Sequence, residues 1–150
     1  MGRDRLFVAV LGMALATTLA AGQGRAQSMP SEAEQLRRLD IMLMVTSLRC
    51  RYGEDDFRPE YNAFTARHLA TLNEAGRALQ RGRGVRSLDT ISTTMANRYG
   101  TGHPWLDCAQ LRGVVQQLSE TGDRRQLLAA ANELLADGPR RADLVAAYAP

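Results

Sequence analysis

Apolar residues recur every three or four positions along most of this 150-residue chain after residue 30. This is the period of an α-helix with one buried face, whereas the strict alternation of apolar and polar residues that marks half-buried strands is nearly absent. The pattern predicts an all-α fold, a small orthogonal bundle of about five helices. A chain of this length is expected to form one domain with a modest core.

The first predicted helix covers residues 32–51. Ser31 and Glu34 have the spacing of a capping box, in which the serine accepts a hydrogen bond from the third helical residue while the glutamate reaches back. Apolar residues then spread around most of the helix: Leu36, Leu39, Ile41, Met42, Leu43, Met44, Val45 and Leu48. A helix that is apolar on most sides needs neighbours on most sides, so we expect it to be central.

Four further helices are expected, over residues 59–80, 88–99, 104–121 and 124–137. Pro59 and Pro104 suit helix starts, Asp123 suits an N-cap, and Gly100, Gly122 and Gly138 suit helix ends. The clearest break is RGRGVRS, residues 81–87, which has two glycines and no helical period. Residues 139–150 either add a short last helix or fray.

The N-terminus has the layout of a secretory signal peptide. Arg3 and Arg5 precede an uncharged, largely apolar run over residues 6–21, and small residues at Gly24 and Ala26 suit cleavage before Gln27. The alternative is an uncleaved anchor, but the run is shorter than the roughly 20 residues that span a bilayer. We therefore predict a signal peptide over residues 1–26 and a single helical domain over residues 27–150. The protein is expected to be periplasmic or secreted, and to contact the membrane only through the uncleaved signal peptide.

The chain has 19 basic residues, all of them arginine, and a formal net charge of +3. Cleavage before Gln27 removes three arginines and one aspartate, which lowers the net charge to +1. A nearly neutral mature domain gives little electrostatic reason to expect nucleic acid as a partner. The one local basic patch consists of Arg77, Arg81, Arg83 and Arg86. It is either the solvated end of a helix or a weak site for an anionic partner.

The chain has two cysteines, Cys50 and Cys108. In an exported protein with an even number of cysteines the simplest prediction is that they form a disulfide. The alternatives are a redox-active pair or two metal ligands, but the C-x-x-C spacing that usually marks such sites is absent.

The stretch RYGTGHPWLDC, residues 98–108, places glycines, a histidine, the only tryptophan and a cysteine together. We predict a helix-to-helix corner in which Gly100 and Gly102 allow unusual backbone angles. Trp105 would then share a helix face with Cys108 and pack against the first helix near Leu48 or Tyr52. The alternative is a functional loop whose binding residues are Tyr99, His103 and Trp105.

Two further groups of side chains have chemistry to consider. His68 and His103, with the cysteines and Met42, Met44 and Met95, contain soft-metal ligands. Their spacing favours core packing instead, so no metal or cofactor is expected. Acids follow the first helix at Glu54, Asp55, Asp56 and Glu60. Together with His103 they suggest a hydrolase, although negative charge at a helix start also serves capping. The motifs G-x-S-x-G and H-E-x-x-H are absent, and the glycines of GTGHP follow no strand.

Three stretches, LRRLDIMLMVTSLRCR, FTARHLATLNEAGRAL and ISTTMANRYGTGHPWLDC, together resemble a group of short exported bacterial helical proteins without an established function. The resemblance covers most of residues 35–120. Some members are labelled S-adenosylhomocysteine hydrolase, an enzyme that binds NAD in a Rossmann domain, and this sequence has neither the strands nor the glycine motif of that domain. In architecture alone the chain is similar to acid-stress chaperones and to small immunity proteins.

The absence of a convergent catalytic set, together with the export signal, favours a non-enzymatic module that binds another macromolecule, either a protein or another envelope component. The alternatives are a small envelope hydrolase using Asp55, Asp56 or Glu60 with His103, and an acid-stress chaperone or immunity protein.

We predict that the mature protein begins at Gln27, because the small residues at positions 24 and 26 fit the subsites of signal peptidase. Intact-mass measurement of the protein from cell-envelope extracts tests this cleavage. A mass that still includes Met1 would contradict both the signal peptide and the prediction of export.

Overall fold

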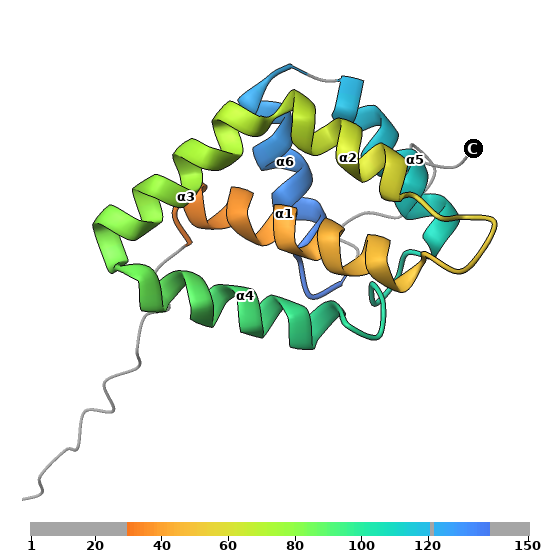
Figure 1. The fold of residues 1–150 in the computed structure, drawn as a ribbon, viewed down its shortest axis with the longest axis horizontal. Coiled ribbons are helices and arrows are strands. Elements are labelled where there is room, and N and C mark those ends of the chain that lie inside the picture. The colour runs from red at the N-terminus through yellow and green to blue at the C-terminus, as the bar shows by residue number, and fades with distance from the viewer. Residues whose placement is uncertain (1–29, 121, 139–150) are drawn as a thin grey trace, which may run out of the picture.

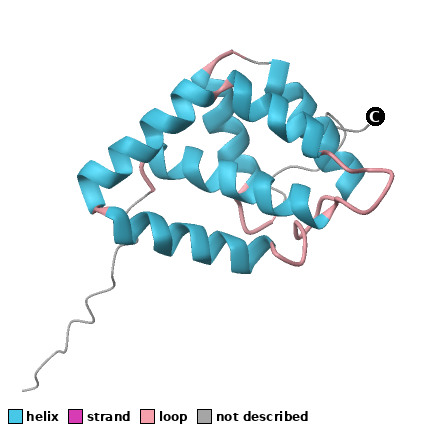
Figure 2. Ribbon diagram, in the orientation of Figure 1, coloured by secondary structure: helices cyan, strands magenta, loops and turns pink. Residues whose placement is uncertain are grey.

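The computed structural model describes residues 30–120 and 122–138, and within these ranges it contains six α-helices and no strands. The helices are α1 (Glu32–Arg49), α2 (Arg58–Arg67), α3 (Leu69–Arg83), α4 (Val85–Tyr99), α5 (Cys108–Glu120) and α6 (Arg124–Leu134). Figure 2 draws the described segments between the helices as loops. No helix among these residues has both the length and the apolar character needed to cross a membrane. The all-α bundle is confirmed, while residues 1–26 and 139–150 lie outside the described residues.

Helix α1 occupies the centre of the bundle and contacts each of the other five helices. In Figure 1, α3 and α4 diverge from their shared turn with α1 between them, and α6 crosses behind α1. Its apolar residues Leu36, Leu39, Met42 and Leu43 are completely buried. The central position expected from the apolar circumference of this helix is therefore confirmed.

The single helix predicted over residues 59–80 is wrong, because the structure divides it at His68. This residue ends α2 and begins α3, with φ −104° and ψ 14°. Its ring Nε2 lies 2.8 Å from the carbonyl oxygen of Leu118, in the last turn of α5. Since a carbonyl can only accept, Nε2 carries the proton and satisfies one of the carbonyls that lack a partner at a helix C-terminus. The sequence has no glycine or proline at this bend. The helical period of apolar residues therefore continues through it, which is why the sequence predicts one helix.

The break predicted over residues 81–87 is also wrong in extent. Helix α3 continues to Arg83 and α4 begins at Val85, so only Gly84 separates them. Gly84 has φ 77°, a backbone conformation that is accessible to glycine and unfavourable for other residues. One residue therefore reverses the chain between the two helices.

The helix predicted from Pro104 begins instead at Cys108. The Asp107 carboxylate accepts from the Gln110 backbone N–H at 2.8 Å, while the Gln110 side chain accepts from the Asp107 N–H at 3.1 Å. This reciprocal cap sets the start of α5.

The two glycines of this segment differ. Gly102 has the left-handed φ of 121° expected of it, whereas Gly100 has φ −60°, a backbone angle that any residue can adopt. The predicted cap of α6 is confirmed, since Asp123 accepts from the Arg125 N–H at 2.8 Å, but α6 ends at Leu134 rather than near residue 137.

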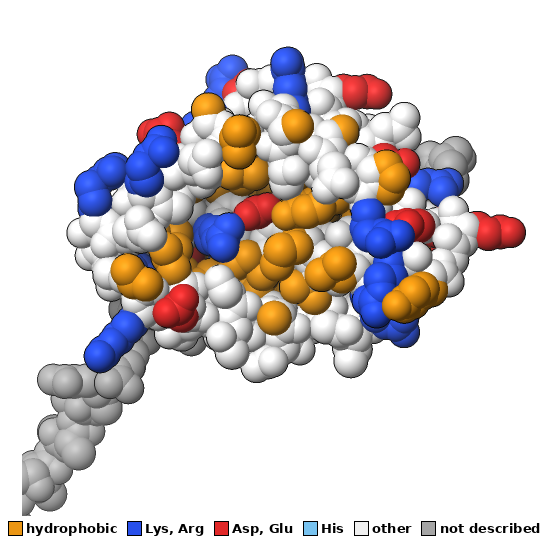
Figure 3. All heavy atoms as spheres, in the orientation of Figure 1, with side chains coloured by type: hydrophobic (Ala, Val, Ile, Leu, Met, Phe, Trp, Pro, Cys, Tyr) orange, Lys and Arg blue, Asp and Glu red, His pale blue; other side chains and the backbone are white. Residues whose placement is uncertain are grey.

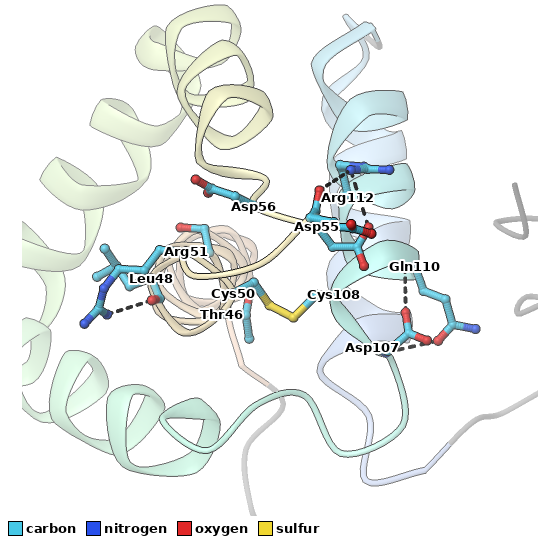
Figure 4. The surroundings of a disulfide bond; sticks show 12 residues. Thr46, Leu48, Cys50, Arg51, Asp55, Asp56, Asp107, Cys108, Gln110 and Arg112 are labelled. Atoms are coloured by element: carbon cyan, nitrogen blue, oxygen red, sulfur yellow. Dashed lines mark hydrogen bonds and ion pairs between the residues drawn. A yellow bond between two sulfur atoms is a disulfide. The ribbon is translucent and has the colours of Figure 1, made fainter.

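The predicted disulfide between Cys50 and Cys108 is confirmed, with the two Cα atoms 5.8 Å apart. Cys50 is the C-cap of α1 and Cys108 is the first residue of α5. Figure 4 shows the bond crossing directly from one helix end to the other. The central helix is thereby linked to a helix that begins 58 residues later in the chain.

We predict that reduction of this disulfide lowers the free energy of unfolding by about 4 kcal/mol, the chain-entropy estimate for a loop of this length. Urea unfolding with and without a reductant measures the loss, and a Cys50→Ser, Cys108→Ser double variant should not respond to the reductant. Labelling of free thiols in the native protein, or equal unfolding midpoints with and without reductant, would show that the cross-link does not form.

Candidate functional site

The segment from Tyr99 to Cys108, here called the corner, brings the three candidate binding residues together. Tyr99 is completely buried and stacks on His103 with the ring centroids 5.6 Å apart. Trp105 meets the His103 ring edge-on, with a centroid distance of 4.5 Å. The three rings form one continuous aromatic cluster with His103 in the middle.

His103 is fixed by a hydrogen bond to the end of another helix. Its Nε2 lies 3.0 Å from the carbonyl oxygen of Leu134, the last residue of α6. That carbonyl can only accept, so the proton is on Nε2. The other ring nitrogen, Nδ1, is buried and has no hydrogen-bond partner among the described residues. Burial lowers the pKa of His103, and the ring is therefore held as a neutral donor to a helix C-terminus.

The predicted helical position of Trp105 is wrong. Because α5 begins at Cys108, Trp105 lies in the preceding loop and does not share a helix face with the cysteine. The partly buried indole packs against the core and the edge of His103. Its packing near Leu48 or Tyr52 stays a prediction.

A cavity of about 250 Å³ lies between the corner and the end of α1, beside the disulfide. His103, Asp107 and Thr46 are among the side chains that line it. The Thr46 hydroxyl donates to the carbonyl of Met42 at 2.8 Å. Asp107 caps α5 and His103 binds α6, so these polar groups are already engaged in holding helix ends. The geometry of the corner is that of a structural joint.

The acids proposed for a hydrolase do not meet His103. Asp55 pairs with Arg112 at 3.4 Å, and Asp56 pairs with Arg58 at 2.6 Å. The Arg58 guanidinium lowers the pKa of Asp56 to about 2 through hydrogen bonding, so this carboxylate stays ionised at neutral pH and cannot act as a proton donor. Figure 4 shows Asp55 turned toward Arg112 on α5.

Neither these two aspartates nor Glu60 lines the cavity beside His103. One carboxylate oxygen of Glu60 is buried and has no partner among the described residues. The catalytic combination suggested by the sequence is therefore not assembled here.

The soft-metal interpretation also lacks support from the geometry. Across residues 30–120 and 122–138, no three histidine, cysteine, aspartate or glutamate side chains are grouped as ligands. Cys50 and Cys108 are joined to each other and offer no thiolate. Met42 is buried in the core. His68 holds the end of α5, as described above.

The predicted basic patch, residues 77–86, flanks the turn between α3 and α4, and one of its members has an unforeseen partner. The Arg83 Nη1 lies 2.7 Å from Glu34 Oε2, and the Arg38 Nη2 lies 2.5 Å from Glu34 Oε1. Ser31 accepts from the Glu34 backbone N–H at 3.2 Å, as a capping box requires, but the Glu34 carboxylate turns toward the two arginines. The i, i+4 spacing of Glu34 and Arg38 could have revealed half of this network.

A scan against protein-family models, a search of curated proteins and a search of solved structures each find no match to this chain. The resemblance to short exported helical proteins remains a prediction.

We predict that His103 makes the free energy of unfolding depend on pH. In the folded protein its pKa lies below the ordinary value of 6.5, chiefly because burial disfavours the charged ring. The folded state therefore binds fewer protons than the unfolded state near this pH. The contribution to stability is complete above about pH 6.5 and is lost progressively as the pH falls below it. Urea unfolding at several pH values between about 7 and 5 should show the decrease.

The matched control is His103→Gln, whose side-chain amide can donate to Leu134 without titrating. This variant should keep the stability of the wild type at pH 7 to within about 1 kcal/mol and lose part of its pH dependence. Other titrating groups are the same in both proteins, so the difference between the two curves isolates His103. Parallel curves would contradict the assignment.

Proposed function

We propose that the protein is an exported, non-enzymatic domain that binds another protein through an exposed apolar face of α1. The observation that carries this proposal is the exposure of Met44 at 38%, Leu48 at 47% and Tyr52 at 84%. These residues follow one another at intervals of four, so Met44 and Leu48 share one side of the helix and Tyr52 follows just beyond its end. The three residues are called the α1 face below.

Figure 3 shows apolar side chains gathered across the middle of the molecule, in the opening between α3 and α4 where α1 lies. Exposed apolar residues that gather in this way, rather than standing singly, are typical of interaction surfaces. Aromatic residues, methionine and arginine are also enriched in the cores of protein interfaces. The composition of the α1 face fits a protein partner.

Two arginines are sequence neighbours of the α1 face, Arg49 next to Leu48 and Arg51 next to Tyr52. Arg51 lies over the Tyr52 ring at 4.2 Å from its centroid and donates to the carbonyl of Leu48 at 2.8 Å. Neither Arg49 nor Arg51 has a carboxylate within ion-pair distance among residues 30–120 and 122–138. A partner that places apolar side chains on Leu48 and acidic side chains around them would complement this surface.

The disulfide is compatible with an oxidising location, and the layout of residues 1–26 favours export to the periplasm or beyond the cell. Among the alternatives, an acid-stress chaperone and an immunity protein would both act by binding another protein. An envelope hydrolase is less well supported, because its acids pair with arginines rather than with His103.

The test is site-specific photo-crosslinking in the natural host, with the reactive group placed at residue 48 or at residue 85. Val85 is the matched control because it is also exposed, at 62%, and lies on α4. We expect one protein to be cross-linked from residue 48 and not from residue 85. The charge reversal Arg51→Glu should abolish this cross-link.

Because Arg51 is exposed, Arg51→Glu should change the free energy of unfolding by no more than about 0.5 kcal/mol. Loss of the cross-link in a folded variant therefore reports on recognition. Equal cross-linking from both positions would contradict a role for the α1 face. A turnover product from cell-wall fragments, with no partner captured, would favour the hydrolase instead.

A further inference from the structure

A second surface feature lies at the opposite end of α1, where α3 turns into α4. In Figure 1 the start of α1 lies close to this turn. A cavity of about 290 Å³ opens here, lined on one side by Glu34, Arg38 and Arg83 and on the other by residues of α4 that include Ser87, Ile91, Thr94 and Met95. We call it the arginine pocket.

The two guanidinium groups of the arginine pocket are held together by one carboxylate. Glu34 is only 4% exposed, and each of its oxygens accepts one hydrogen bond, from Arg38 and from Arg83. Two like charges would otherwise repel, so the carboxylate between them fixes their positions. Each guanidinium has five N–H donors and uses one of them on Glu34. The three charged groups together have a net charge of +1.

One of the remaining donors is both buried and unused. The Nε of Arg38 is inaccessible to solvent and has no hydrogen-bond partner among the described residues. Because this nitrogen is closed off from solvent, a ligand in the pocket would contact the Nη groups of Arg38 and Arg83 instead, where each guanidinium keeps N–H donors beyond the one used on Glu34.

Helix α4 adds hydroxyl groups from the other side of the pocket. Ser87 and Thr94 are seven residues apart, which places them two turns apart on one side of the helix. The hydroxyl of Thr90, between them, donates to the carbonyl of Arg86 at 2.9 Å. No such bond occupies Ser87 or Thr94 within the described part of the chain. Ile91 and Met95 supply an apolar surface beside these donors.

We propose that the arginine pocket binds the phosphate group of a small soluble molecule. Guanidinium forks on one side and hydroxyls on the other can donate to oxygens that point in different directions, which suits a tetrahedral oxyanion. The net positive charge favours an anion, and the apolar surface accommodates the carbon skeleton that bears the phosphate. This site uses different residues from the α1 face.

The test is an NMR titration with inorganic phosphate at constant ionic strength, following the side-chain Nε–H resonance of Arg38. We expect a saturable shift of this resonance. Arg83→Gln should weaken binding about tenfold or more, because it removes one of the two guanidinium groups. The matched control is Arg81→Gln, which removes the same charge from the same helix outside the pocket and should bind as the wild type does.

A second variant avoids disturbing the Glu34 ion pairs. Thr94→Val keeps the shape of the side chain and removes its hydroxyl, and it should weaken phosphate binding about threefold or more. Any of three results would overturn the proposal. These are the absence of a saturable shift, a loss of binding in Arg81→Gln equal to that in Arg83→Gln, and wild-type binding by both single variants, Arg83→Gln and Thr94→Val. A shift caused by vesicles of an anionic phospholipid, but not by inorganic phosphate, would also overturn it, because the phosphate would then belong to a membrane surface.

Discussion

The burial of α1 is the constraint on which the rest of the fold depends. Leu36, Leu39, Met42 and Leu43 lie on one side of this helix and Ile41 lies on another, and each of these residues is buried, so other helices must pack around it. All five do so. The bundle is thus one central helix packed against five others. Met44 and Leu48 of the α1 face lie where those helices leave α1 exposed.

His68 and His103 each donate a hydrogen bond to a carbonyl near the C-terminus of another helix. A helix ends with carbonyl groups that have no partner within the helix, and these need donors when they are buried. His68 donates to the last turn of α5, and His103 donates to the last residue of α6. In each case the ring joins segments that are distant in sequence. The histidines thus act as tertiary caps.

Features governed by local sequence could be predicted, and features governed by contacts between distant segments could not. The apolar circumference of α1 and the caps at Ser31 and Asp123 depend on neighbouring residues, and two cysteines leave one intramolecular pairing. The bend at His68 depends on a carbonyl 50 residues away, so the unbroken helical period concealed it. At Glu34 only the backbone half of the predicted capping box forms. The Glu34 carboxylate does not reach back to Ser31, because it accepts a charge-assisted hydrogen bond from Arg83. The spacing of Asp107 and Gln110 is that of a capping box and indicates the start of α5. Pro104 also suits a helix start, and the prediction followed it instead.

The position of the disulfide has a consequence for how the protein is made. Cys50 leaves the ribosome and any export channel well before Cys108, and α2, α3 and α4 all lie between them. The bond therefore cannot close until most of the chain has emerged. Because the sequence contains no third cysteine, oxidation within one molecule has a single product. A thiol oxidase is sufficient to complete the covalent structure, and a disulfide isomerase has no mispaired intramolecular bond to correct.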